Sequence, residues 1–471
     1  MGFFGFLGAS AASFSLYALL NHRLFGYNRK RKPAEGSWKV MAAPAKEISF
    51  QSSQVNGLNL HIMPTEKFKT TTIVVMIEQE LSQAYVTKTA LLAHVLKRAT
   101  ARFPDTRKLS EHLDMLYGAI FDIDVVKKGE RQILQVYLEV PNEKYLSDSV
   151  PLLEQAFQFA GEVLVHPYLE NHAFSEKYLN TEKESLRKRI ESLIDDKMRY
   201  ANQRITEEMF KDEPFSLLVY GRREDLAAID GAGLYRYYQE LLSRNPIDVF
   251  VVGDVESAQI QEYVKAHVKP ERRQPVTLPP ANAQKDVQQV REVVDRLDVS
   301  QGKLNIGCRT HVTYKDDDYP ALQVCNGILG GFPHSKLFIN VREKASLAYY
   351  AVSRLESHKG VLMMMSGIDV ANYERAVSIM KEQLEQVKAG KISDEELNLT
   401  KATLTNQFRE LLDSARMMID FTYNGLLSGR KRLLTEMLQA FADTTLEDVK
   451  RVADKIQLDT IYLLRDRKES V

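Results

Sequence analysis

The feature that most constrains the fold is an order of strand and helix patterns that occurs twice along the chain. Each of two stretches of roughly 200 residues opens with strand patterns, continues with long helical patterns and closes with an apolar strand between acidic residues. The closing strands read PIDVFVVGD over 246–254 and LDTIYLLRD over 458–466. Strands that build one sheet and long helices that cover it are typical of the α+β class. We therefore expect two α+β repeats of low mutual identity.

In the first repeat, alternating strand patterns flank Asn56 and Gly57, a residue pair that favours a tight hairpin turn. Hydrophobic periodicity then predicts a series of strands and helices up to residue 268. The predicted strands cover 70–80, 131–141 and 245–255, and the predicted helices cover 87–101, 106–117, 147–164 and 171–209.

The segment 269–286, KPERRQPVTLPPANAQKD, contains four prolines and charges of both signs, which indicates an extended linker. It divides the chain into an N-terminal extension over 1–40, a first repeat over 41–268 and a second repeat over 287–471. The second repeat again begins with a strand and ends with one. Its predicted strands cover 302–312, 360–369 and 458–466, and its predicted helices cover 319–331, 334–344, 372–390 and 393–412.

The composition argues against several classes of function. Lys plus Arg and Asp plus Glu each number 63, so net charge gives no reason to expect a nucleic acid partner. The two cysteines, Cys308 and Cys325, are too few for a disulfide framework or a cysteine-rich metal site. We expect a globular protein of the cytoplasm.

The first residues form an exception, because 3–20 is an uncharged run of 18 residues followed by the basic stretch RKRK at 29–32. A run of this length approaches that of a membrane span, although its glycines and serines make it only modestly apolar. A weak membrane anchor, an amphipathic surface segment and an extension outside the folded body all fit this pattern. Met41 offers an alternative start to Met1.

The stretch TALLAHVLKRAT over 89–100 places a histidine, His94, on a helix rich in leucine. Lys97 and Arg98 follow it by three and four residues. Several segments, together with this helix and the repeated fold, resemble the pitrilysin/insulinase superfamily of zinc peptidases over about 48–467. They are NGLNLHIMP, VVGDV, GKISDEEL and, most specifically, SKLFINVREKASLAYYAVS over 335–353.

The resemblance implies that each repeat has a mostly antiparallel sheet and that the chain forms half of a clam-shell chamber. It also aligns His94 with the first zinc ligand, Lys97 with the general base and Arg98 with the second ligand of the family motif His-x-x-Glu-His. An ammonium cannot accept a proton and a guanidinium cannot bind a metal ion. We therefore expect no zinc and no hydrolysis by this chain alone, and we interpret His94 as a packed helix residue.

The third ligand of the family is a glutamate on a later helix. In this chain Glu182, Glu184 and Glu191 are all candidates, and the sequence does not choose among them. The charge pattern of the surrounding helix is typical of a solvated face; the alternative is that its cations line a chamber and favour acidic peptides.

The same resemblance implies a role for Arg342 and Tyr349, which keep the spacing of an Arg and a Tyr in the second repeat of the family. In members that work as pairs, one chain binds zinc and the other supplies these two residues to hold the peptide and stabilise the oxyanion. We therefore expect a heterodimer with a zinc-bearing partner, which acts on peptides or unfolded proteins. The alternative is a structural or peptide-binding subunit with no part in catalysis, in which Arg342 is a solvated helix end and Tyr349 fills a strand.

Overall fold

A computed structural model describes residues 47–147, 150–281 and 285–467. The predicted extension over 1–40, with the apolar run 3–20 and the choice between Met1 and Met41, lies outside these residues. Among the helices of the described ranges, none is long and apolar enough to span a bilayer.

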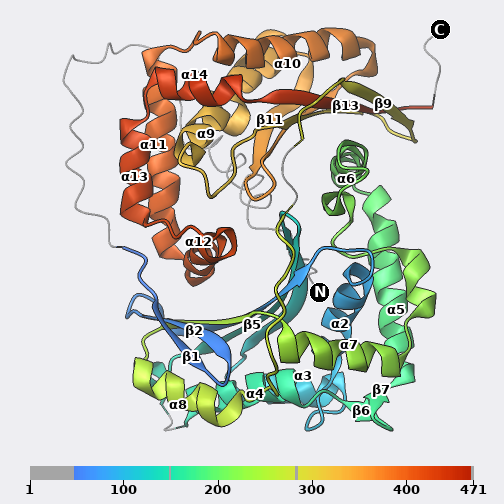
Figure 1. The fold of residues 1–471 in the computed structure, drawn as a ribbon, viewed down its shortest axis with the longest axis vertical. Helices are drawn as coiled ribbons and strands as arrows, with labels where there is room; N and C mark the ends of the chain where they lie inside the picture. The colour runs from blue at the N-terminus through green and yellow to red at the C-terminus, as the bar shows by residue number, and fades with distance from the viewer. Residues whose placement is uncertain (1–46, 148–149, 282–284, 468–471) are drawn as a thin grey trace. The chain divides into compact units, whose positions relative to one another are not determined.

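The first repeat is built on a six-stranded sheet with the order β1-β2-β8-β3-β5-β4 (Figure 1). All neighbours are antiparallel except β2 and β8, which are parallel. The predicted hairpin is confirmed, because Asn56 and Gly57 join β1 and β2 with φ angles of 52° and 73°. The strands are β1 (Gln51–Val55), β2 (Leu58–Pro64), β3 (Thr70–Glu80), β4 (Ile120–Lys128), β5 (Arg131–Pro141) and β8 (Ile247–Gly253).

The second repeat is built on a five-stranded sheet with the order β11-β12-β10-β13-β9. Its only parallel pair is again the one that involves the closing strand, here β13 with β9. Read from the other end, this order matches the first sheet strand for strand, with β1 as an addition. The duplication predicted from the closing strands is therefore confirmed. The strands are β9 (Arg291–Arg296), β10 (Gly302–Arg309), β11 (Ala348–Glu356), β12 (Val361–Ile368) and β13 (Gln457–Arg465).

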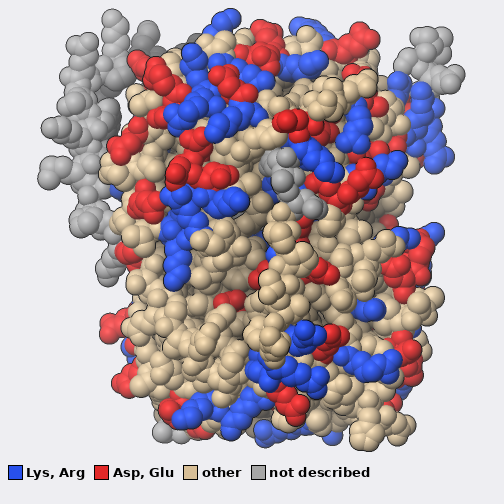
Figure 2. Space-filling model, in the orientation of Figure 1, with Lys and Arg blue, Asp and Glu red and all other residues tan. Residues whose placement is uncertain are grey.

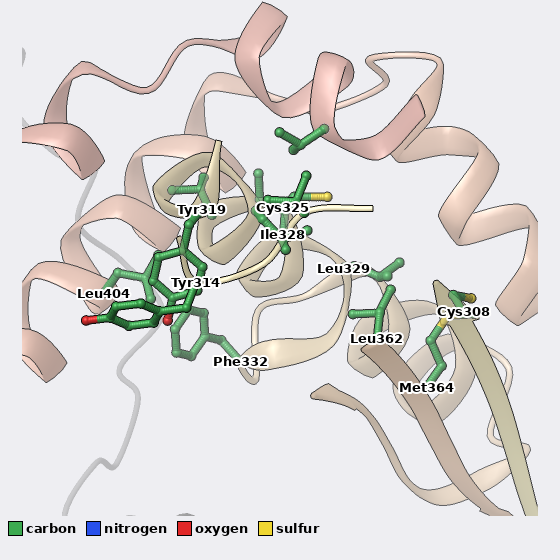
Figure 3. Packing of buried hydrophobic residues seen from close by; sticks show 14 of the residues in the cluster. Cys308, Tyr314, Tyr319, Cys325, Ile328, Leu329, Phe332, Leu362, Met364 and Leu404 are labelled. Carbon is green, nitrogen blue, oxygen red and sulfur yellow. The ribbon is translucent and has the colours of Figure 1, made fainter. Parts of the chain in front are cut away.

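Helices cover one face of each sheet. The other, inner face is turned toward the opposite repeat. The first sheet packs its helix-side core against α2 (Val86–Arg98), α4 (Leu152–Val165) and α7 (Gly231–Arg244). The second packs against α9 (Tyr319–Asn326), α10 (Tyr373–Lys388) and α14 (Leu446–Asp454). Figure 3 shows how Cys308 and Met364 from its strands lie with Leu329 and Leu362 in this core. The remaining helices are α3 (Thr106–Met115), α5 (Glu176–Glu191), α6 (Lys197–Met209), α8 (Ser257–His267), α11 (Asp394–Glu410), α12 (Ala415–Ser428) and α13 (Leu434–Asp443).

The repeats exchange one helix each. In the first repeat, α6 packs on β13 of the second sheet (Figure 1) and on its neighbour β10. Ala201 and Ile205 of this helix meet Tyr462 and Leu464 there. In the second repeat, α12 reaches the inner face of the first sheet, and the ring of Tyr423 lies 6.1 Å from that of Phe250. The inner face of each sheet is thus covered partly by the other repeat.

This exchange of helices explains a difference between the predicted and the observed elements. A single helical pattern over 171–209 was expected, but the chain breaks at Ser192–Ile194 and restarts at Asp196, whose carboxylate accepts hydrogen bonds from the amides of Met198 and Arg199. The break lets α6 leave α5 and cross to the second sheet. The expected helix over 334–344 is a π-helical turn, Phe338–Lys344. Strands β4 and β9 and helices α7, α12, α13 and α14 were not predicted.

Candidate functional site

Helix α2 carries the degenerate motif at its last turn. Its buried side chains, which include Leu91, Leu92 and Leu96, fix the helix on the first sheet. This leaves Lys97 and Arg98 near the C-terminal end, where cations interact favourably with the helix dipole. The charged helix α5 packs across α2 and brings Glu182 to the motif.

Glu182 contacts both His94 and Arg98. Its Oε1 accepts a hydrogen bond from Nη1 of Arg98 at 2.6 Å, and its Oε2 lies 3.4 Å from Nδ1 of His94. Burial raises the pKa of Glu182, but the hydrogen bonds and positive charges of His94 and Arg98 outweigh burial and leave this pKa below its usual value. The guanidinium of Arg98 also lies over the ring of Tyr178, 4.7 Å from its centroid. The carboxylate of Glu182 thus lies between the guanidinium of Arg98 and the imidazole of His94.

The geometry chooses among the three glutamates that the sequence left open. Glu184 and Glu191 both bind Arg187, at 2.6 Å and 2.5 Å, on the exposed side of α5. Only Glu182 among the three contacts the motif, and it is the buried one. Glu182 is therefore the one of the three candidates that lies beside His94 and Arg98.

Two further ion pairs continue from this site along the edge strand β4. Lys97 binds the carboxylate of Asp122. Arg189, on α5 seven residues after Glu182, holds both oxygens of Asp124 at 3.1 Å and 2.8 Å and bonds the hydroxyl of Tyr220 at 2.6 Å. Lys97, Arg98 and Arg189 are therefore neutralised in place by carboxylates. This result makes an acidic peptide a poor ligand for these particular cations.

The residues present do not fit a zinc ion. The carboxylate of Glu182 is occupied by a permanently charged guanidinium, and His94 is the one remaining side chain of the motif that could bind a metal ion. A divalent ion placed between His94 and Glu182 would lie beside the charge of Arg98 and be repelled by it. Across the described ranges, no three His, Cys, Asp or Glu side chains gather as a metal site.

Arg342 and Tyr349 lie in the second repeat, on an irregular segment before and at the start of β11. The guanidinium of Arg342 lies over the ring of Phe338, 4.6 Å from its centroid, and remains partly exposed. Tyr349 is 78% exposed, the most exposed large hydrophobic residue in the described part of the chain. Both side chains are thus available to a ligand.

Local backbone irregularities present these two residues. Arg342 lies within the π-helical turn, a geometry that is frequent at functional sites. Ser346 between them has a φ of 53°, a strained value for a residue other than glycine. The pairing of β11 with β12 shifts register between Ala348 and Tyr350, so Tyr349 is the extra residue of a bulge, which turns its side chain away from the sheet.

Tyr350 behaves differently from its neighbour Tyr349. Its ring packs near Gly367, and its hydroxyl is buried without a hydrogen bond among the described residues. Burial raises the pKa of Tyr350 to about 12.

Sequence reasoning missed the partners of the motif cations. Asp122 and Asp124 alternate with the apolar Ile123 and Val125, a pattern typical of a half-buried strand. Recognition of that strand would have placed two carboxylates beside α2. The contact of Arg189 with Tyr220 depends on the path of the loop after α6, and the sequence carries no local signal for it.

Comparison with known proteins agrees with this geometry. A family model described as "Peptidase M16 inactive domain" matches residues 228–404, a range that includes Arg342 and Tyr349. The chain is 46% identical over 418 residues to "Probable inactive metalloprotease YmfF" of Bacillus subtilis (strain 168), which covers 89% of this chain and 98% of that protein.

Solved structures share the whole fold. A conserved protein from Enterococcus faecalis V583 superposes with a TM-score of 0.83 at 34% identity, over 90% of this chain and 100% of that one. A protease from Helicobacter pylori superposes with a TM-score of 0.73 at 19% identity, over 88% of this chain and 99% of that one. The second likeness is one of fold alone.

Proposed function

Because this chain belongs to the M16 family of the pitrilysin/insulinase superfamily and has lost the base and second ligand of the zinc motif, we propose that it assists hydrolysis performed by another chain. The partner is a zinc-bearing member of the same family with an intact His-x-x-Glu-His helix. This chain completes a shared chamber and binds a peptide or unfolded protein there, while the partner supplies the metal.

The observation that carries the proposal is the exposure of the Arg342 and Tyr349 side chains. A structural filler residue would be packed, yet Tyr349 stands exposed at a strand bulge and the Arg342 guanidinium is held by Phe338 without burial. A planar guanidinium holds a carbonyl in fixed geometry, and a phenol adds a second donor. Donors placed before the reaction begins stabilise the negative charge that develops on the peptide carbonyl oxygen.

The contrast between the two halves of the chain supports the same function. In the first repeat, Lys97, Arg98 and Arg189 are neutralised by carboxylates of the same repeat. The second repeat keeps an exposed Arg and Tyr at the family spacing. This difference between the repeats is expected of a chain that binds no metal ion but still has the residues that hold the substrate.

The test is a complex isolated through an affinity tag on this chain in its native host, followed by a peptide-cleavage assay with and without a chelator. Arg342→Ala and Tyr349→Phe are each expected to lower turnover about ten- to a thousand-fold while the complex still assembles, because each removes one oxyanion donor.

Matched controls lie beside both residues. Lys344→Ala removes an exposed cation of the same π-helical turn, and Tyr350→Phe removes a buried hydroxyl without a partner. Both should leave turnover unchanged. Equal turnover in Arg342→Ala, Tyr349→Phe and the controls would exclude the assisting role and favour a purely structural or peptide-binding subunit.

A further inference from the structure

The two repeats are joined by a pair of equivalent hairpin turns that carry the same dipeptide. Lys128 and Gly129 lie at the turn between β4 and β5, and Lys359 and Gly360 lie at the turn between β11 and β12. Both glycines have positive φ angles, 54° and 73°, which favour glycine. These strands occupy corresponding positions in the two sheets, so the turns are related by the duplication.

Each turn lysine binds a carboxylate from the other repeat. Nζ of Lys128 lies 2.6 Å from Oδ1 of Asp420 on α12. Nζ of Lys359 lies 2.6 Å from Oε1 of Glu130 and 2.6 Å from Oε2 of Glu213, which follows α6. The exchange of contacts is thus reciprocal, like the exchange of α6 and α12.

The charges around Lys359 are fully buried. The side chains of Lys359, Glu130 and Glu213 are 1%, 5% and 3% exposed. Arg309 binds Glu213 at 3.1 Å and Asp459 at 2.7 Å, and both side chains of the latter pair are 5% exposed. Glu130 and Glu213 belong to the first repeat, whereas Lys359, Arg309 and Asp459 belong to the second.

The turns are also in close steric contact. The amide of Gly129 donates to Oε1 of Glu356 at 3.0 Å. A Cβ at Gly129 would lie 2.9 Å from Cβ of His358, so the two turns touch where a side chain could not fit.

We infer that the reciprocal Lys-Gly turns form a clasp that holds the two repeats in one fixed arrangement. Buried ion pairs add little net stability, but a partial displacement would leave charges buried without partners, which is costly. The clasp therefore disfavours intermediate arrangements of the repeats. Where the pairing proposed above holds, the opening that admits a peptide takes place between this chain and its partner, not between the repeats.

The test is a distance measurement by pulsed electron paramagnetic resonance on the full chain alone, with spin labels at Ser185→Cys on α5 and Lys381→Cys on α10. Both positions are exposed, and the native Cys308 and Cys325 are buried, so labelling is directed to the introduced thiols. The chain without further substitutions should show one narrow distance distribution, with or without an added unfolded peptide.

Lys359→Met should broaden this distribution or add a second distance. Lys128→Met should do so to a smaller degree, because the side chain of Lys128 is 16% exposed and that of Asp420 is 53% exposed. Lys67→Met is the matched control, since Lys67 also binds a carboxylate of the other repeat, Asp413, but at an exposed position. It should leave the distribution narrow. Should Lys359→Met fail to fold, Lys128→Met and the unsubstituted chain decide the matter.

A broad or double distribution in the unsubstituted chain would overturn the inference, as would narrow distributions in both clasp variants. The measurement needs neither a partner nor activity, so its failure would leave the proposed peptidase pairing untouched.

Discussion

Arg98, which the resemblance aligns with the second ligand of the zinc motif, contacts the carboxylate of Glu182 through its guanidinium. Arg98 thereby links α2 to α5 with a charge that needs no cofactor. Glu182 is 12% exposed at its side chain, so the pair is more buried than the neighbouring pair of Lys97 with Asp122, whose side chains are 51% and 29% exposed. The two adjacent cations therefore differ in what they contribute to stability.

Arg98→Ala should lower the free energy of unfolding by about 1–3 kcal/mol, because it leaves the carboxylate of Glu182 poorly solvated and short of a partner. Lys97→Ala on the same helical turn should cost less than about 1 kcal/mol, as expected of an exposed pair. Urea unfolding of both variants measures the difference. Equal losses, or a larger loss for Lys97→Ala, would contradict the structural role of Arg98.

At the scale of elements, the irregular segment from α9 to β11 positions Tyr349. The π-helical turn Gly327–Gly331 follows α9 and packs against β11. Gly330 lies so close to this strand that a Cβ would be 2.5 Å from the amide nitrogen of Ser353. Gly330 is required because a side chain has no room at this position, and not because of its backbone angles.

Gly330→Ala should lower the free energy of unfolding by about 1–3 kcal/mol, because the methyl group meets backbone that cannot move aside without shifting β11. Gly331→Ala offers a neighbouring comparison, since its Cβ would approach no atom closer than 3.2 Å. We expect a smaller loss there, by the same urea assay. If Gly330→Ala were as stable as the unsubstituted chain, the close packing of this turn would be refuted.

The sequence predicted elements whose periodicity is local and missed several others, among them features set by contact with the other repeat. The hairpin at Asn56 and Gly57 and the closing strands β8 and β13 follow from turn residues and apolar runs. By contrast, the break before Asp196 serves a contact of α6 with the distant second sheet. The bulge at Tyr349 likewise depends on its register with β12. The positions of the motif residues could be predicted from the sequence, but the carboxylates that pair with them could not.

For the whole molecule, the junction of the repeats makes stability depend on pH. His358 lies at the turn between β11 and β12, next to Lys359. Burial lowers the pKa of His358 from 6.5 and outweighs the charge of Glu356 and the hydrogen bond with Asn424, which raise this pKa. Burial likewise lowers the pKa of His112 and of His334. The unfolded chain therefore binds more protons than the folded chain as the pH falls through 6.5, so stability decreases with acidification.

Urea unfolding at several values between pH 7.5 and about 5 should show this decrease, and His358→Asn should make it shallower because one of the three histidines no longer takes up a proton on unfolding. The pKa of Glu213 is also lowered from 4.5, because the hydrogen bond and charge of Lys359 outweigh burial. The stability that this shift contributes is lost only at still lower pH. Stability that stays constant or rises on acidification from pH 7 to 5.5 would contradict this account of the junction.

The most direct test of the central claim, that this chain has no metal chemistry of its own, is the zinc content of the purified full-length chain after incubation with zinc and removal of excess. The unsubstituted chain should retain no stoichiometric zinc, because Arg98 occupies Glu182. The double variant Lys97→Glu, Arg98→His should retain close to one zinc ion per chain, since His94 and Glu182 are already in place. One tightly held zinc ion in the unsubstituted chain, lost when Glu182 is replaced by glutamine, would contradict the claim.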